Sequence, residues 1–236
     1  MKFSLKTLIP ISIFLFAGCA EVDFDQAEAK KPKFFGKMAV FWVDQSTDSS
    51  GSGGRFIYVP DPAKPLTFIR DESVEGAEII VPGAFYTDGG SIPRQFQVFR
   101  GFSPWAYGPV YIVHDWLFAA RRCAELPEAT DEQKKTLELE FQDTVDIFLE
   151  SLVALRRSRR IEQSDIAQRS ISYVISGPPS RNLWNDGKEC SRANLDAIEL
   201  GKSINRLRSQ KSGPRVAGDT AMVNQVEVQL VTEFSF

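Results

Sequence analysis

The sequence predicts an α+β fold in which an N-terminal antiparallel β-sheet is followed by a helical half. Between residues 37 and 86, short runs rich in β-branched and aromatic residues alternate with clusters of glycine, proline and serine, which is typical of strands and their turns. From about residue 105 the apolar residues recur every three or four positions, as they do on helices. A hydrophobic content of 43% is enough for a buried core.

Length and charge restrict the class of protein further. The 236 residues fit one domain with tails. The 28 basic and 31 acidic residues give a net charge of -3, so we expect no nucleic-acid partner, because such proteins carry a basic surface. We divide the chain into a signal peptide (1–18), a tether (19–35) and a single α+β domain (36–236).

The N-terminus has the pattern of an export signal. Two lysines precede an apolar run over residues 8–17, which is shorter than the ~20 residues that span a bilayer. The following "FAGC" resembles the bacterial lipoprotein processing box, which implies cleavage before Cys19 and its lipidation. Ala20 comes next, so we expect an outer-membrane lipoprotein that faces the periplasm. The alternative is a plain secreted protein with a cysteine near its cleavage site.

Four strands are predicted before residue 87. They lie in "KMAVFWV" (37–43), "RFIYVP" (55–60), "LTFIR" (66–70) and "AEIIVPGAFY" (77–86), and a Ser- and Gly-rich stretch at 46–54 forms a hairpin-type connection.

Four helices and one further strand are predicted in the remainder. The helices lie in segments 105–123, 130–155, 164–176 and 191–209. The first begins after Gly108 with Pro109 in its first turn, and Thr130 caps the second. In the last segment (224–236) apolar residues alternate, so it should be a strand that returns to the N-terminal sheet with one apolar face; these residues are Val226, Val228, Leu230, Phe234 and Phe236.

His114 is the only histidine in the chain, and it lies on an apolar helix face with Tyr111 and Phe118. A histidine in this position is either a core residue or a catalyst. Asp115 follows it and projects from the same turn. Two polar side chains that face partly inward need partners from elsewhere in the fold.

Two further aspartates are candidate partners. Asp146 lies opposite the main apolar stripe of the second helix, between residues of a second stripe, so it is either inside a second packing contact or in water. Asp88 precedes two glycines in "TDGGSIP". This stretch is either an ordinary turn or a loop in which Asp88, together with Asp115, binds Ca²⁺ through oxygen ligands. Zinc is disfavoured, because one histidine and two cysteines distant in sequence make a poor ligand set.

Cys123 and Cys190 remain after removal of the signal peptide. In an oxidising compartment they either form a disulfide or stay as two thiols, and their spacing does not decide between these states.

Three motifs together resemble a known family. "VPGAFYTDGGSIPR", "VHDWLF" and "VDIFLESL" follow one another as in the domain-of-unknown-function 1353 family of phage and bacterial proteins, over roughly residues 75–177. This resemblance implies a domain label, and it also suggests a phage-related or partner-binding module.

A second resemblance is to bacterial and fungal secreted phospholipases A2. "DGGS", "HDWLF" and "VDIF" occur in the order of that family's loop, histidine-aspartate pair and second helix. The resemblance implies an antiparallel helix pair, with His114 as the base that activates water, Asp146 as its orienting residue, and Asp115 with Asp88 as calcium ligands. Gly90 stands where those enzymes have a cysteine.

The sequence therefore predicts a membrane-tethered, Ca²⁺-dependent hydrolase of phospholipids or other esters. The alternative is a non-catalytic envelope lipoprotein in which the same residues form a buried polar network. A third interpretation, in which Ser91 is a nucleophile with His114 and Asp146, ranks lower, because "GGSIP" lacks the closing glycine of a nucleophile elbow.

Overall fold

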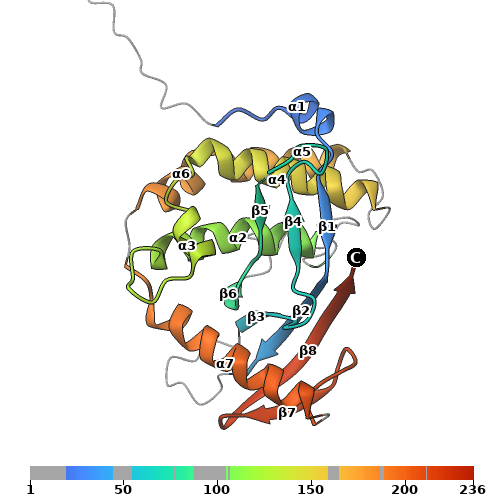
Figure 1. Cartoon of the computed structure of the whole chain (residues 1–236), viewed down its shortest axis with the longest axis vertical. Coiled ribbons are helices and arrows are strands. Elements are labelled where there is room, and N and C mark those ends of the chain that lie inside the picture. Colours follow the sequence, from blue (N-terminus) through green and yellow to red (C-terminus); the bar gives the residue numbers. More distant parts are fainter. Residues whose placement is uncertain are drawn as a thin grey trace, which may run out of the picture.

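The structure is a computed structural model that describes residues 20–44, 55–76, 78–87, 105, 107–158, 165–186, 189–210 and 212–236. These residues form two antiparallel sheets packed with helices (Figure 1), which confirms the predicted α+β class. Within these ranges no helix is both long enough and apolar enough to cross a bilayer.

The strands form two sheets, where the sequence predicted one. The larger sheet has the order β6-β3-β2-β8-β7, with β2 at Lys37–Val43, β3 at Arg55–Pro60, β6 at Phe85–Thr87, β7 at Thr220–Val223 and β8 at Val226–Ser235. The smaller has the order β1-β4-β5, with β1 at Lys33–Phe35, β4 at Thr67–Ile69 and β5 at Ile79–Ile80. The segment predicted as one strand at 77–86 contributes to both, because Pro82 and Gly83 interrupt it and proline cannot donate to a ladder.

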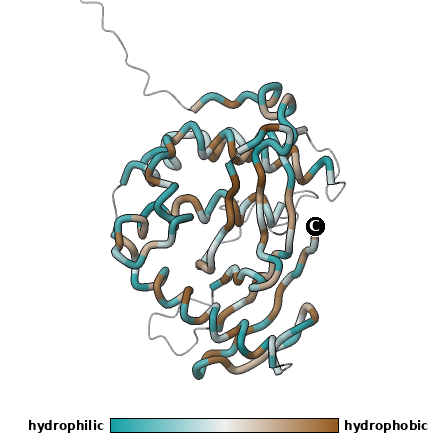
Figure 2. The backbone as a smooth tube through the Cα atoms, in the orientation of Figure 1, coloured by the Kyte–Doolittle hydropathy of each residue, from teal (hydrophilic) through white to brown (hydrophobic). Residues whose placement is uncertain are grey.

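The larger sheet lies between two apolar layers. Met38 and Val40 of β2 belong to the core shared with helices α2 (Gly108–Cys123) and α4 (Phe141–Arg157). Phe41 and Val43 belong to a second core under helix α7 (Arg192–Ser209). Because successive side chains of a strand point to opposite faces, β2 is buried on both sides. Figure 2 shows hydrophobic residues concentrated along these inner strands and helices.

The helices follow the predicted order with three differences. The helices are α1 (Phe24–Ala29), α2 (Gly108–Cys123), α3 (Asp131–Lys135), α4 (Phe141–Arg157), α5 (Asp165–Ile175), α6 (Pro178–Asn185) and α7 (Arg192–Ser209). Of these, α1 and α6 are additional, and the helix predicted over 130–155 is divided into α3 and α4. Thr130 caps α3, as expected, and Glu140 is the N-cap of α4, where it forms a second capping box. The prolines at 178 and 179 start α6, since proline suits a first turn.

Strand β8 confirms the predicted return to the N-terminal sheet, but its apolar face changes along its length. It pairs with β2, and the register shifts between Val40 and Phe41. Val228 and Leu230 therefore pack in the core under α7, while Phe234 packs in the other core. A one-residue irregularity reverses which side chains face each layer.

The residues assigned to a tether are part of the folded body. Asp23 caps α1 by accepting a hydrogen bond from the Gln26 N–H at 2.9 Å. Ala27 is buried, and the Phe34 ring lies 5.0 Å from that of Phe68. The short helix and strand β1 thus bury apolar side chains that a free tether would expose to water.

Candidate functional site

The histidine-aspartate pair lies on α2 beside the end of strand β6. The Thr87 hydroxyl donates a hydrogen bond to Asp115 Oδ2 at 2.8 Å. Thr87 directly precedes Asp88 in the chain, so the "TDGGS" motif begins next to Asp115. Asp88 itself and Ser91 lie outside the described residues.

The His114 ring is largely enclosed by aromatic side chains. Its centroid lies 5.1 Å from the Phe118 ring and 5.3 Å from the Phe148 ring, and its side chain is 9% exposed. Nδ1 lies 3.5 Å from Asp115 Oδ1, which is long for a hydrogen bond. Nε2 is buried and has no hydrogen-bond partner in the part of the chain that the structure describes. The imidazole is therefore packed but not fully satisfied.

Tyr111 is a fourth member of this cluster. It precedes Asp115 by four positions on α2, so the two side chains share a helix face. Burial raises the pKa of the Tyr111 hydroxyl well above its ordinary value, and the negative charge of Asp115 adds to the effect. Tyr111 thus remains a neutral phenol beside the carboxylate. The four-residue spacing from Asp115 was the sequence signal for it. We call Thr87, Tyr111, His114 and Asp115 the HD cluster.

Asp146 has other neighbours than the ones we expected. Its carboxylate accepts a hydrogen bond from Gln142 Nε2 at 2.9 Å. Phe148, which contacts the His114 ring, is two positions along α4, and two positions rotate a helix by roughly 200°. Asp146 therefore projects away from His114, and no contact among the described residues supports its predicted role as the orienting acid. The interpretation in which Asp146 lies within a second packing contact fits the structure.

That second contact holds the N-terminal segment. Gln142, Asp146 and Glu150 recur every four residues on α4, and we call these three residues the α4 clamp. The Glu21 N–H donates to Gln142 Oε1 at 2.8 Å, and Gln142 Nε2 donates back to the Glu21 carbonyl at 2.9 Å. One turn beyond Asp146, Glu150 pairs with Lys30. One polar stripe thus binds both ends of the segment that contains α1.

Burial makes Asp146 harder to ionise within this stripe. Burial raises its pKa above the ordinary value for aspartate, while the Gln142 hydrogen bond and the charge of Arg70 act in the opposite direction. The nearby charge of Glu150 adds to the increase. Asp146 is thus a half-buried carboxyl whose ionised form is disfavoured by burial. It has no imidazole partner among the described residues.

Glu150 is the most buried charge of the clamp. It is 1% exposed and receives two hydrogen bonds from the Arg70 guanidinium, at 2.7 and 2.8 Å. A third Arg70 nitrogen binds Glu78 at 2.8 Å. Burial alone would lower the pKa of Arg70, but these carboxylates raise it, so Arg70 stays charged. We did not predict this network. Its sequence signal is a glutamate inside the apolar run 145–155, which requires a buried partner.

The far end of the same helix also binds the N-terminal segment. Arg157 donates to the carbonyls of Lys30 and Glu28 at 2.6 and 2.7 Å, and Arg156 pairs with the Glu28 carboxylate at 2.9 Å. Backbone and side-chain contacts therefore fix residues 21–30 along the whole length of α4.

Calcium binding by the HD cluster rests on residues that the structure describes only in part. Across the described ranges, no three His, Cys, Asp or Glu side chains gather closely enough to hold a metal ion. Asp115 offers one carboxylate beside Thr87, whereas Ca²⁺ takes six to eight oxygens. The calcium site with Asp88 and Asp115 stays a prediction.

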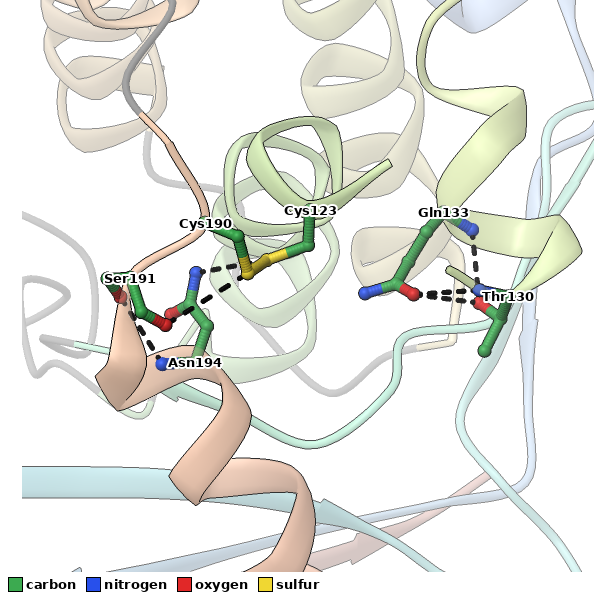
Figure 3. The surroundings of a disulfide bond; sticks show 6 residues. All are labelled: Cys123, Thr130, Gln133, Cys190, Ser191 and Asn194. Atoms are coloured by element: carbon green, nitrogen blue, oxygen red, sulfur yellow. Dashed lines mark hydrogen bonds between the residues drawn. A yellow bond between two sulfur atoms is a disulfide. The ribbon is translucent and has the colours of Figure 1, made fainter. Parts of the chain in front are cut away.

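Cys123 and Cys190 form a disulfide, so the alternative that the sequence left open is decided. Their Cα atoms are 4.6 Å apart. The bond joins the end of α2 to the segment that leads into α7, where Asn194 donates to Cys123 Sγ at 3.7 Å (Figure 3). It fixes the end of the helix that carries the HD cluster.

Comparison with known proteins supports the first family resemblance. The profile of the family described as "Protein of unknown function (DUF1353)" matches residues 63–163. The matched segment begins and ends about a dozen residues before the limits expected from the motifs, and it contains the His114–Asp115 pair and the whole of α4. The family description assigns no activity. Neither the curated proteins nor the solved structures that were searched contain a match to the chain.

Proposed function

We propose that this protein is a lipid-anchored lipoprotein of the bacterial envelope whose domain is fastened directly to its anchor. The observation that carries the proposal is the α4 clamp. It grips the chain from Glu21 onward, two residues after the cysteine of the lipoprotein-like "FAGC" motif. An acyl group on Cys19 would therefore join a fixed part of the domain, with no flexible linker between them.

In this proposal the HD cluster has a structural role. The Thr87–Asp115 hydrogen bond connects the larger sheet to α2, and His114 fills a space between Phe118 and Phe148. A hydrogen-bonded polar group at such a junction fixes how two elements pack. The function then depends on the position of the domain at the membrane, and it does not require catalysis.

Lipidation is tested by comparing the full chain with Cys19→Ser in bacterial cells. We expect the wild-type protein to fractionate with membranes and its mature N-terminus to carry the mass of an acylated cysteine. The serine variant should lose the acyl mass and accumulate as unprocessed precursor. Normal processing of that variant, without any acylated form of the wild type, would favour the plain secreted protein and refute the proposal.

A second candidate function is ester hydrolysis on the lipids of that membrane. It is favoured by the hydrogen bond from Thr87, the first residue of the "TDGGS" motif, to Asp115, and by His114 Nε2, which has no hydrogen-bond partner among the described residues. A neutral imidazole nitrogen can accept a proton from water as the water attacks an ester carbonyl. Calcium, if held by Asp115 and Asp88, would stabilise the negative charge that develops on the carbonyl oxygen.

The hydrolase is tested by fatty-acid release from phosphatidylglycerol vesicles with calcium or with a chelator. If it is correct, His114→Ala should lower the rate by about 10²-fold or more, and the chelator should abolish release. Asp146→Asn is the matched control, because the structure places Asp146 in the clamp: a comparable loss in this variant would restore its predicted role as the orienting acid. No release by the correctly folded wild type would leave the non-catalytic function.

A further inference from the structure

The corner between α5 and α6 exposes apolar side chains. Tyr173 and Val174, in the last turn of α5, are 68% and 59% exposed, and Leu183 on α6 is 47% exposed. Ile171 and Trp184 on the same two helices are buried, so each helix carries both a buried and an exposed apolar side chain. We call Tyr173, Val174 and Leu183 the α5–α6 corner.

The described part of the chain begins at this corner. The Ala20 N–H donates a hydrogen bond to the Ser176 carbonyl at 3.1 Å, and Ala20 is buried. Ser176 lies between α5 and α6, two residues after Val174. Ala20 therefore lies beside the turn that joins the two helices, and Cys19 is its covalent neighbour in the sequence, one Cα–Cα step of about 3.8 Å away.

We propose that the α5–α6 corner is a membrane-contacting surface that enters the leaflet to which Cys19 is anchored. The inference rests on the proposed lipidation, and it adds the part of the fold that meets the lipid. Acyl chains on Cys19 lie in the hydrocarbon, so the residue itself is held near the headgroups. Cys19 is bonded to Ala20, and Ala20 is hydrogen-bonded to Ser176. In this proposal the turn between α5 and α6 therefore lies at the same depth as Cys19.

The side chains of the corner suit that depth. Tyrosine is enriched at membrane interfaces, because its ring is apolar and its hydroxyl is polar. Arg169 is exposed one turn before Tyr173 on α5, where its charge can meet anionic lipid phosphates. A leaflet therefore accounts for the exposed apolar groups, the neighbouring cation and the path of the chain together.

This orientation predicts which surface points away from the membrane. Strand β7 and helix α7 lie at the opposite end of the molecule from α1 and α5 (Figure 1). Met222 on β7 is 63% exposed, about as apolar and as exposed as the residues of the corner. It serves as a matched position that should stay in water.

The test places an environment-sensitive fluorophore on the full acylated chain in vesicles of phosphatidylethanolamine and phosphatidylglycerol. One variant carries the label at Leu183→Cys and the other at Met222→Cys, with the native disulfide intact. We expect blue-shifted emission and strong quenching by spin-labelled lipid at position 183, and neither effect at position 222. Adding Val174→Glu to the first variant should reverse most of the shift, whereas Val216→Glu should not.

Each contrary result has a distinct meaning. A chain that floats with the vesicles but keeps a water-like label at position 183 would refute the membrane-contacting corner and leave the lipid anchor intact. A chain that carries no acyl group and does not float would refute both proposals. Blue-shifted emission in detergent-free buffer without vesicles would show that the protein covers the corner itself, by a second copy if the shift depends on concentration and by the same chain if it does not.

Discussion

The α4 clamp and the HD cluster are both polar groups set in apolar helices, but they differ in how completely they are paired. In the clamp, the buried Glu150 carboxylate binds Arg70 and Lys30. In the HD cluster, Asp115 binds Thr87, while His114 Nε2 and the Tyr111 hydroxyl are buried without a partner among the described residues. A buried polar group without a hydrogen bond costs free energy.

This difference separates a structural network from a candidate site. The polar groups of the clamp bind one another, Arg70 or the N-terminal segment, and the packing of that segment explains why they are there. In the part of the chain that the structure describes, the HD cluster has two buried polar atoms without a hydrogen-bond partner, so a ligand or a water molecule has groups to bind there. Variants that disrupt one region or the other should therefore differ in how much stability they lose.

Removing the carboxylate of Glu150, the most buried residue of the clamp, should have the largest effect on the free energy of unfolding. Glu150→Ala leaves the charges of Arg70 and Lys30 without their shared partner, and we expect a loss of about 3–5 kcal/mol in the free energy of unfolding. Urea denaturation followed by circular dichroism measures it. Glu72→Ala removes an exposed ion pair with Lys33 and is the control, with a loss below about 1 kcal/mol. Equal losses in both variants would contradict the importance of the clamp.

Removing the disulfide should have the next largest effect, and it tests what supports the HD cluster. The bridge spans a sequence separation of 67 residues, so Cys123→Ser with Cys190→Ser should lower the free energy of unfolding by about 2–4 kcal/mol, because the unfolded chain gains freedom. Thermal melting with and without reductant gives the comparison. Reductant should lower the melting temperature of the wild type and leave that of the double variant unchanged; a response in the double variant would contradict the assignment.

Removing the paired contact of the HD cluster should have a moderate effect. Thr87→Val keeps the side-chain shape but leaves Asp115 without its hydroxyl donor, and we expect a loss of about 1–2 kcal/mol. Thr87→Ser keeps the hydroxyl and should retain more of the stability against urea. If valine is tolerated better than serine, the methyl group and not the hydrogen bond connects β6 to α2.

The smallest effect is expected at Asp146. Because its folded-state pKa is raised, the folded protein favours the protonated form. The contribution of this group to stability is therefore greatest at acid pH and decreases as the pH rises through the unfolded pKa of about 4 towards the folded value. Asp146→Asn should remove this decrease and raise stability at pH 7 by less than about 0.5 kcal/mol, since the group is half solvated. Melting curves between pH 3 and 7 test the sign.

Much of the fold could be predicted from local patterns. The strands at 37–43 and 55–60, the start of α2 at Gly108 and the final strand follow from alternation, helical periodicity and proline placement. The break before α4 was missed, because the helical pattern continues through it while Glu140 forms a new cap. The sequence also did not predict that the apolar side chains of β8 switch from one face of the sheet to the other. The switch comes from a register shift against β2, and alternation within a single strand does not reveal such a shift.

Only the part of the candidate site that lies where β6 meets α2 could be predicted from the sequence. Thr87 meets Asp115, whereas the sequence pointed to its neighbour Asp88, which lies outside the described residues. The partners of Asp146 and Glu150 were not predictable, because they depend on where residues 21–30 fold, and that segment has the composition of a polar linker. Its helix and strand owe their stability to tertiary packing more than to local propensity.

The pairing of β8 with β2 has a consequence for the export that we propose. These strands are separated by most of the chain, yet Met38 and Phe234 are paired and the Phe34 and Phe236 rings stack at 5.1 Å. Both apolar layers gain their closing strand only when the last residues arrive. A polypeptide that must cross a membrane before folding benefits from such an order of events, since its central strand keeps one side unpaired until translocation is nearly complete.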